Sequence, residues 1–122
     1  MYFSFWAVPV PNGKRGDYAD HSKLVGGWFL ENGATRIIES WGESVPHGKQ
    51  TDWHRAVAAG DDETPCVGFA EWPDQATCDA AKERMEDAAQ NDERFDDEKH
   101  PMPFDGKRMI FGDFAVITEL QR

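Results

Sequence analysis

Apolar residues occupy both faces of the segment Met109–Leu120, whose residue types predict a β-strand. Phe111 and Ile117 fall on one face of such a strand, whereas Ile110 and Phe114 fall on the other. The strand predicted near the N-terminus has the same character, with aromatic residues on both faces. An antiparallel sheet with one face in water alternates apolar and polar residues instead. The sheet that contains these strands must therefore be covered on both faces.

The predicted elements follow the order β-α-β-β-α-β. Apolar residues spaced three and four apart predict a helix over Gly16–Asn32, and Asp74 is the predicted N-cap of a second helix over Ala76–Ala89. Strands are predicted at Tyr2–Val10, Thr35–Trp41, Thr64–Trp72 and Met109–Leu120. This order predicts an α+β, ferredoxin-like βαββαβ fold, in which a four-stranded antiparallel sheet carries two helices on one face. We expect residues 1–122 to form a single domain of this kind.

The face of the predicted sheet that carries no helix needs a cover of its own. A second copy of the same sheet supplies one, and an interface of this kind buries about 1,600 Å² or more. We therefore expect a homodimer through the helix-free sheet face, with the two sheets packed together or closed into a dimeric α/β barrel.

The charge of the chain argues against nucleic acids and membranes as partners. It carries 23 acidic and 13 basic residues, a formal net charge of −10, and its basic clusters Lys14-Arg15 and Lys107-Arg108 are short. Phosphate backbones and anionic lipids repel such a surface. No apolar run approaches the ~20 residues of a membrane span, and the first residues lack a signal-peptide pattern. With two cysteines and no Cys-x-x-Cys pair, we expect a cytoplasmic protein with reduced thiols.

A stiff turn precedes the last predicted strand. Prolines on either side of Met102 restrain the backbone, and Asp105-Gly106 favours a turn. Asp105 and Lys107-Arg108 therefore lie at the mouth of the strand. The guanidinium of Arg108 suits the carboxylate of a small acid, because it offers two parallel N–H groups. As a structural alternative, Asp105 caps its own turn and pairs with Arg108.

The run Pro103–Ile110, followed by Gly112, is the most specific signature of the chain. Other distinctive residues are spread over nearly its whole length: Tyr18, Trp28, Gly33-Ala34, Val45-Pro46, Gly48-Lys49, Thr51, Arg55-Ala56-Val57 and Asp62-Glu63-Thr64. Together these residues resemble the YbaA-like proteins, a small bacterial family of unknown function. The resemblance implies the dimeric α/β-barrel superfamily, which includes cofactor-independent monooxygenases, haem-degrading and haem-dependent enzymes, and small-molecule-binding stress proteins. Because it implies no single activity, it assigns no catalytic residue.

The two longest connections are the predicted location of a site, since loops longer than the fold needs are often functional. The connection Val45–Asp62 carries His54 and four candidate ligand-binding residues, namely His47, Lys49, Trp53 and Arg55. The connection Asn91–Gly106 contributes Phe104 and Asp105, with Lys107 and Arg108 just beyond it. A structural role is the alternative for the first connection: Thr51–Val57 then forms an extra edge strand with Trp53 in the core.

Three functions remain open on this sequence. In the first, the protein binds a small apolar or aromatic acid in a pocket beside the sheet. In the second, it is a cofactor-independent monooxygenase- or isomerase-like enzyme, in which His54 or Asp105 takes a proton and Arg108 stabilises the resulting anion. In the third, it is a structural or interaction dimer without a ligand.

Neither a metal nor a cofactor is expected. His47 and His54 are seven residues apart and match no His-Glu-x-x-His or paired Cys/His spacing. Haem is disfavoured because, apart from His21, no histidine falls in a predicted strand or main helix. Cys66 and Cys78 have no neighbouring base in the sequence and are predicted to be inert, buried thiols.

Overall fold

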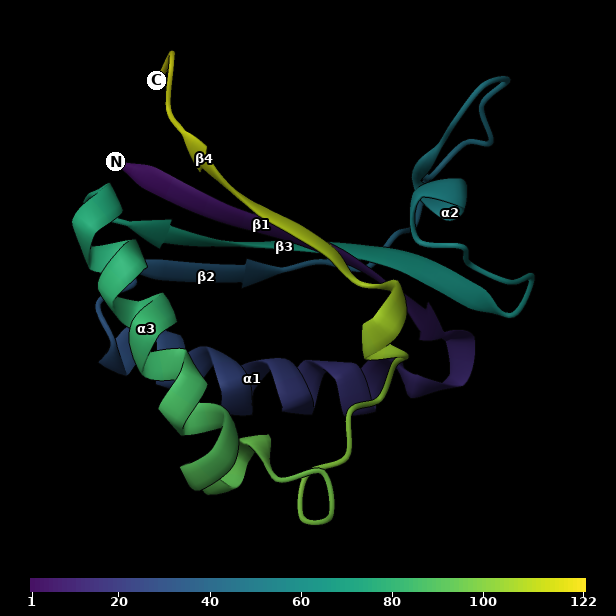
Figure 1. Ribbon diagram of the computed structural model, residues 1–122. Helices are drawn as coiled ribbons and strands as arrows, with labels where there is room; N and C mark the ends of the chain where they lie inside the picture. Colours follow the sequence, from purple (N-terminus) through teal and green to yellow (C-terminus); the bar gives the residue numbers. More distant parts are fainter.

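The sheet has four antiparallel strands in the order β2-β3-β1-β4. A computed structural model describes all 122 residues, and both long helices lie on the same face of the sheet (Figure 1). The strands are β1 (Tyr2–Pro11), β2 (Arg36–Glu39), β3 (Glu63–Trp72) and β4 (Ile110–Ala115). The helices are α1 (Arg15–Glu31), α2 (Trp53–Ala56) and α3 (Gln75–Asn91), with 3-10 turns η1 (Asn12–Lys14), η2 (Glu93–Phe95) and η3 (Gly106–Arg108). The predicted α+β, ferredoxin-like order is confirmed.

β1 lies at the centre of the sheet, between β3 and β4. Its pairing with β3 runs from Tyr2 to Pro11, whereas its pairing with β4 runs only from Tyr2 to Ala7. Pro9 and Pro11 have no N–H to donate to a neighbouring strand. Because they lie beyond the end of β4, they interrupt no hydrogen bond with that strand.

Local capping residues set the ends of the long helices. Asp74 accepts a hydrogen bond from the N–H of Thr77 at 2.8 Å and caps α3, as predicted. At the end of α1 the Asn32 side chain donates to the carbonyl of Trp28 at 2.8 Å. Gly33 follows with a φ of 108°, a conformation that glycine adopts at little cost. None of the helices combines the length and apolar character that crossing a bilayer requires.

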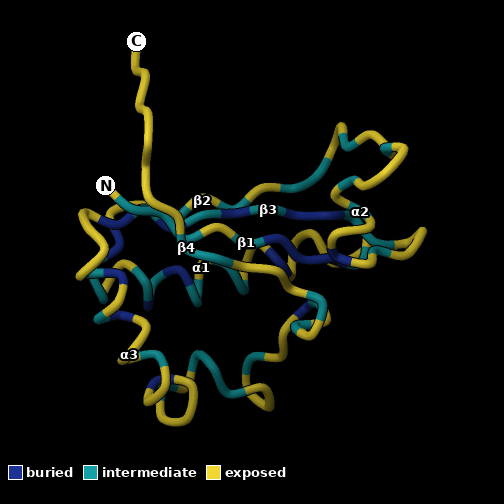
Figure 2. The backbone as a smooth tube through the Cα atoms, turned by 45° about the horizontal axis from the view of Figure 1, so that its top comes forward, coloured by how far each residue is buried: buried dark blue, intermediate teal, exposed yellow.

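The core lies between the sheet and the two long helices. One cluster joins β3 to α3 through Ala70, Trp72 and Cys78, and a second cluster includes Val8 and Cys66. Figure 2 shows the buried backbone concentrated along β1 and β3. Both cysteines are buried and unpaired, as predicted. Only 18 of 122 residues are buried, because a cavity occupies part of the helical layer and the other face of the sheet is open.

The open face of the sheet is aromatic. The rings of Phe3 and Phe5 stack with their centroids 5.6 Å apart, and Phe69 and Phe114 contact them edge-on at 5.4 and 5.5 Å. Phe5 is 43% exposed and Phe114 is 54% exposed. We refer to Phe3, Phe5, Ile38, Phe69 and Phe114 as the open-face cluster. The prediction that both faces of the sheet are apolar is therefore confirmed.

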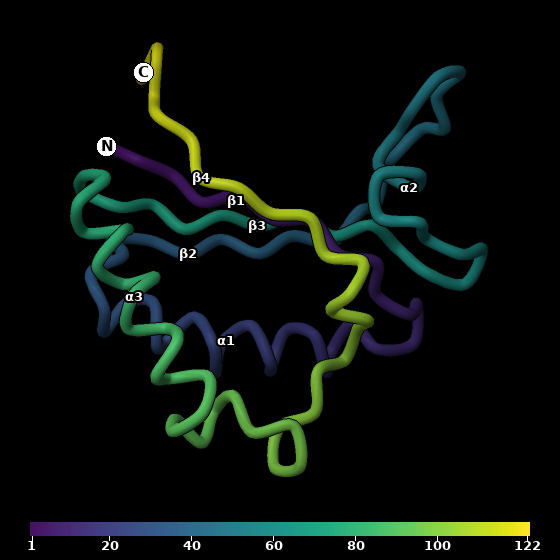
Figure 3. The backbone as a smooth tube through the Cα atoms, in the orientation of Figure 1, coloured from purple at the N-terminus to yellow at the C-terminus, as the bar shows by residue number.

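β4 is shorter than predicted. The sequence indicated a strand as far as Leu120, but the strand ends at Ala115. Ala115 lies opposite Tyr2, the first residue of β1, so the residues that follow Ala115 lie beyond the end of that strand. The C-terminal segment leaves the sheet (Figure 3), and Ile117 and Leu120 are 96% and 93% exposed.

The long connection from β2 to β3 contains a helical turn rather than an edge strand. Asp52 accepts a hydrogen bond from the N–H of Arg55 at 2.7 Å and so caps α2. The alternative of an extra strand with Trp53 in the core is wrong, since Trp53 lies in α2 and is half exposed. An Asp side chain that satisfies a helical N–H favours the turn over extended backbone.

Candidate functional site

A cavity of about 580 Å³ lies between the sheet and the two long helices. Its lining comes from the strands, from α1 and α3, and from the connection that returns from α3 to β4. Most of the lining residues are apolar, and the aromatic ones include Trp6, Trp28, Phe29, Phe95, Phe104 and Phe111. This size and lining are typical of sites that hold small organic molecules.

Ring-to-ring contacts hold the aromatic wall of the cavity in place. Trp28 meets Phe29 and Phe95 edge-on, with centroid distances of 5.3 and 6.0 Å. Phe29 in turn stacks on Trp6 of β1 at 6.3 Å. These contacts tie α1, η2 and the sheet together, so the wall is formed without a ligand.

Glu39, at the end of β2, is the main polar group of the wall. The alternation of β2 sends Ile37 and Glu39 towards the helices. Glu39 Oε1 accepts hydrogen bonds from Trp6 Nε1 at 2.9 Å and from the hydroxyl of Tyr18 at 2.8 Å. Its Oε2 accepts one longer bond, from Ser22 Oγ at 3.3 Å. Oε2 therefore keeps acceptor capacity for a further donor.

Gly68 of β3 makes room for this arrangement. A Cβ at this position would collide with Glu39 Oε1, and would lie 2.6 Å from Trp6 Nε1 and 2.8 Å from the carbonyl oxygen of Ile38. A backbone carbonyl in a sheet has little freedom to retreat. The absence of a side chain at Gly68 thus allows the Trp6–Glu39 hydrogen bond to form.

Burial shifts the titration of this group. Desolvation raises the pKa of Glu39 above its ordinary value of 4.5, although the hydrogen bonds from Trp6, Tyr18 and Ser22 oppose the shift. Burial, together with the neighbouring charge of Glu39, raises the pKa of Tyr18 as well. A carboxyl group with a raised pKa in an apolar cavity is a common feature of functional sites.

A second polar group lies where β1, α3 and β4 meet. Asp113 accepts a hydrogen bond from Ser4 Oγ at 2.6 Å and pairs with Lys82. Burial acts to raise the pKa of Asp113, but the hydrogen bonds from Lys82 and Ser4 outweigh it and hold that pKa below its usual value. Ser4 Oγ also accepts from Trp72 Nε1 at 3.0 Å. These groups satisfy one another and so contribute mainly shape and charge to the cavity.

Two histidines lie at the rim of the cavity. His21 and His100 line both the cavity and a polar surface depression beside it, as does Met102. Phe104 contacts the ring of His21 edge-on at 5.7 Å. Desolvation lowers the pKa of His21, which favours its neutral form. His21 therefore adds an imidazole that favours its neutral form to the rim of the cavity.

The predicted site residues fall into three groups. Of the predicted site residues, only Phe104 lines the cavity. Lys107 and Arg108 lie in the turn η3, which Asp105 caps, and the remaining candidates lie in the connection from β2 to β3: His47, Lys49, Trp53, His54 and Arg55. The predicted catalytic set of His54, Asp105 and Arg108 does not converge on the cavity.

Arg108 acts as a clamp between η3 and the end of the long connection. It forms a bidentate ion pair with Glu63, both N–O distances being 2.7 Å, and donates to the carbonyl of Ala58 at 2.8 Å and to Asp105 at 3.0 Å. Asp105 accepts the N–H of Lys107 at 3.0 Å and so caps its own turn. The hydrogen bonds from Arg108 hold the pKa of Glu63 below its ordinary value. With four of its five N–H donors in hydrogen bonds, Arg108 has the pairing with Asp105 that was the structural alternative in the sequence analysis.

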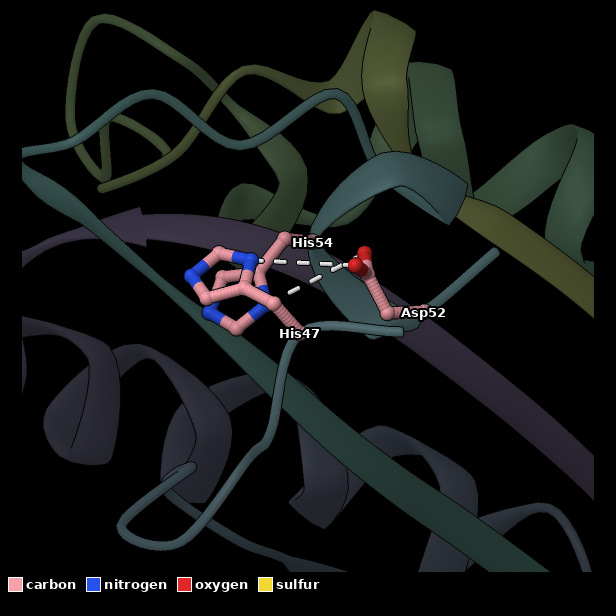
Figure 4. Close-up of side chains that lie close together, drawn as sticks. All are labelled: His47, Asp52 and His54. Atoms are coloured by element: carbon pink, nitrogen blue, oxygen red, sulfur yellow. Dashed lines mark ion pairs between the residues drawn. The ribbon is translucent and has the colours of Figure 1, made fainter. Parts of the chain in front are cut away.

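His47 and His54 meet beside Asp52, although they are seven residues apart. Their rings stack with centroids 4.1 Å apart, and Figure 4 shows both turned towards the Asp52 carboxylate. The Asp52 carboxylate accepts the N–H groups of Gly48 and Arg55 at 3.0 and 2.7 Å, and these bonds lower its pKa. The long connection folds around this one buried carboxylate.

The sequence analysis missed Glu39 and its partner Tyr18. A signal was available in the alternation of Arg36-Ile37-Ile38-Glu39, which puts Glu39 on the same strand face as the apolar Ile37. An acidic residue in phase with a buried residue indicates a buried carboxyl group. Tyr18 could be assigned to the apolar face of α1, but its hydroxyl partner depends on the tertiary fold.

Comparison with solved structures supports the fold. A crystal structure of a dimeric ferredoxin-like protein from an uncultured marine organism matches with a TM-score of 0.60 and 14% sequence identity, covering 98% of this chain and 97% of that one. A protein from Agrobacterium tumefaciens matches with a TM-score of 0.53 and 10% identity, covering 99% of this chain and all of the other. At these identities the matches concern the fold alone.

Comparison of sequences gives the family. The chain is 37% identical over 118 residues to the uncharacterized protein YbaA of Escherichia coli K12 and, to the same extent, to that of Shigella flexneri, with 97% of each chain covered. Residues 1–106 match the family model described as a protein of unknown function, DUF1428. These matches confirm the resemblance that the run Pro103–Ile110 indicated. The chain therefore belongs to the DUF1428 family, as a YbaA-like protein with a ferredoxin-like fold.

Proposed function

We propose that this protein binds a small, mainly aromatic or apolar molecule in the cavity between its sheet and helices. One observation carries the proposal: an aromatic cavity of about 580 Å³ contains the Glu39 carboxylate, whose Oε2 accepts only one long hydrogen bond, from Ser22 Oγ at 3.3 Å. Apolar walls supply affinity, and one well-positioned polar group supplies orientation. The ring of the ligand would lie among Trp6, Trp28 and Phe29.

The polar group of the ligand is expected to be a hydrogen-bond donor. When it is ionised, Glu39 has acceptor atoms and no donor, so it favours a hydroxyl or amine over a carboxylate. The cationic groups in the lining are already paired, Lys82 with Asp113 and Arg94 with Glu31. A phenol or an aromatic amine therefore fits better than the aromatic acid that the sequence analysis favoured.

The second part of the proposal is a homodimer through the open-face cluster. Two of its rings, Phe5 and Phe114, are about half exposed, and exposed apolar patches of this kind mark interfaces. The exposed side chains of Ile117 and Leu120 extend the apolar surface beyond the end of β4. The structural neighbour from the marine organism is itself described as dimeric, which supports the same assembly here.

Quenching of tryptophan fluorescence by 1-naphthol tests the ligand proposal, because Trp6, Trp28 and Trp72 line the cavity. We expect saturable quenching at one site per chain. Glu39→Gln should weaken binding at least about tenfold, the value of a hydrogen bond to a charged group. Glu43→Gln is the matched control, since Glu43 is exposed and lies outside the cavity.

The proposal fails if 1-naphthol does not bind, or if both glutamate variants bind it equally. Native mass spectrometry of the freshly purified protein complements this test. A retained small molecule in the dimer would also give the chemical class of the natural ligand.

The raised pKa of Glu39 favours one second candidate, a cofactor-independent enzyme. A carboxylate whose pKa lies closer to neutrality is a better general base. In such an enzyme Glu39 would take a proton from a bound phenol, in place of the predicted set of His54, Asp105 and Arg108. Turnover of an oxidisable phenol with dioxygen as the oxidant, which Glu39→Gln abolishes without loss of binding, would support this candidate over simple binding.

A further inference from the structure

Three potential metal ligands gather outside the cavity, at the start of α2. His47 Nδ1 lies 3.7 Å from Asp52 Oδ2, and His54 Nδ1 lies 4.0 Å from Asp52 Oδ1. One ligand atom from each of the three residues lies within 4.8 Å of the others. Figure 4 shows the two imidazole rings on the same side of the carboxylate.

These distances are too long for hydrogen bonds but close to those around a metal ion. N–O hydrogen bonds have lengths of about 2.7–3.2 Å. Two ligand atoms that each lie about 2.0–2.2 Å from a tetrahedral zinc ion are separated by about 3.4 Å. The ligand atoms therefore lie farther apart than an ion requires, at 3.7 Å and 4.0 Å between each histidine and the Asp52 carboxylate and at most 4.8 Å between any two of the three residues. The side chains must move together to close around an ion.

The hydrogen bonding of these side chains also favours a bound cation. His54 Nδ1 is buried and has no hydrogen-bond partner, which is rare for a polar atom in a folded protein. The side chain of Asp52 is only 3% exposed and is held by the N–H groups of Gly48 and Arg55. Each of its oxygens keeps a free lone pair. A cation between these groups would satisfy the orphaned nitrogen and the remaining lone pairs together.

We propose that His47, Asp52 and His54 bind one divalent transition-metal ion, with Zn²⁺ as the best match. Two imidazoles and one carboxylate form a ligand set that zinc accepts, and three protein ligands leave a fourth position open to water or another small ligand. This site goes beyond the proposed function of the cavity, whose lining does not include any of the three residues.

Ion binding requires His47 to move. The two rings are stacked at an interplanar angle of 20°, and nearly parallel rings cannot both direct their in-plane lone pairs at one ion. His47 can rotate because its side chain is 78% exposed. Arg55 Nε, 3.8 Å from Asp52 Oδ2, opposes the ion by charge, but its side chain is half exposed and is free to turn towards solvent.

Zinc titration of the full chain, after removal of bound metal with a chelator, tests the proposal by isothermal calorimetry. We expect one Zn²⁺ per chain, and Co²⁺ in its place should give the intense visible absorption of a tetrahedral site. His47→Gln should lower the affinity at least about tenfold and leave thermal stability without metal unchanged, because His47 is exposed. His100→Gln is the matched control and should bind zinc like the original protein.

The result that would overturn the proposal is equally specific. Either an absence of stoichiometric binding, or binding that His47→Gln and His100→Gln weaken equally, removes the site. His54→Gln is informative only if it folds, so circular dichroism accompanies it. If His54→Gln does not fold, the comparison of His47→Gln with His100→Gln decides the question.

Discussion

The two faces of the sheet consist of the same kinds of residues but differ in what covers them. On one face Trp6 and Trp72 lie under α1 and α3, and Trp72 is fully buried. On the other face Phe5 and Phe114 have no cover within the chain. The same alternation of aromatic residues therefore gives two different surfaces. One face of the sheet encloses a cavity under the helices, and the other is an exposed apolar surface.

Polar groups separate the two faces further. The covered face contains Glu39, whose carboxylate is held by donors from β1 and α1. On the open face, Arg36 and Glu71 form an ion pair with an N–O distance of 3.7 Å, and the Arg36 guanidinium lies over the Phe69 ring. A buried acceptor in a cavity suits a small ligand, whereas an apolar surface with satisfied charges suits a second protein surface.

The largest expected effect concerns the covered face. Trp72→Ala should lower the free energy of unfolding by about 3–5 kcal/mol, because it removes a fully buried indole and leaves Ser4 without its donor. Trp53→Ala, at a half-exposed position, should change it by less than about 1 kcal/mol. Urea denaturation at fixed protein concentration measures both. Equal effects would mean that the core is not on the helical side of the sheet.

The next effect concerns the open face. Phe114→Asp should convert a dimer into a monomer, because it puts a charge next to Phe5 in the open-face cluster. Leu30→Asp introduces the same charge at an exposed leucine on α1 and should leave the mass unchanged. Light scattering after size exclusion gives the mass of each variant. A Phe114→Asp protein with the mass of the original would disprove the interface.

A smaller effect is expected beside the cavity. Gly68→Ala should cost about 1–3 kcal/mol, since the new Cβ must displace Glu39 or Trp6 and the carbonyl of Ile38. Gly13→Ala is the control, because nothing lies within 4 Å of a Cβ there. Thermal unfolding compares the two. A Gly68→Ala protein as stable as Gly13→Ala would contradict the close approach of Glu39 and Trp6.

The smallest expected effect is a pH dependence. The raised pKa of Glu39 means that the folded protein prefers its protonated form, so this preference is complete below pH 4.5 and is lost as the pH rises through the raised value. The Tm of the original protein relative to Glu39→Gln should therefore fall from pH 4.5 to neutrality. A difference that stays constant over this range would show that Glu39 titrates as an exposed carboxyl.

Elements that depend on near neighbours in the chain were predictable. Asp74 caps α3 through Thr77, and Asp105 caps η3 through Lys107. Both contacts span two or three residues, so the sequence contains them directly. The predicted strand through Leu120 was wrong because residues 116–120 have suitable side chains but face no further backbone of β1.

Contacts between distant residues were not predictable in the same way. Glu39 meets Trp6 from 33 positions away, and Arg108 meets Glu63 from 45. Single side chains cannot indicate such partners, because their meeting depends on strand register and helix position. This is why Arg108 was a candidate for ligand binding although four of its five N–H donors are occupied within the chain.

By itself, the sequence determined the order and type of the elements, the need to cover both faces of the sheet and the family. These follow from periodicity, caps and a specific run of residues, all of which are local properties of the chain. Only the tertiary structure decided that Glu39 lies in an aromatic cavity, that Arg108 closes a loop, and that His47 and His54 share Asp52. The physical reason is that burial and charge pairing are properties of neighbours in space, which the folding of the whole chain brings together.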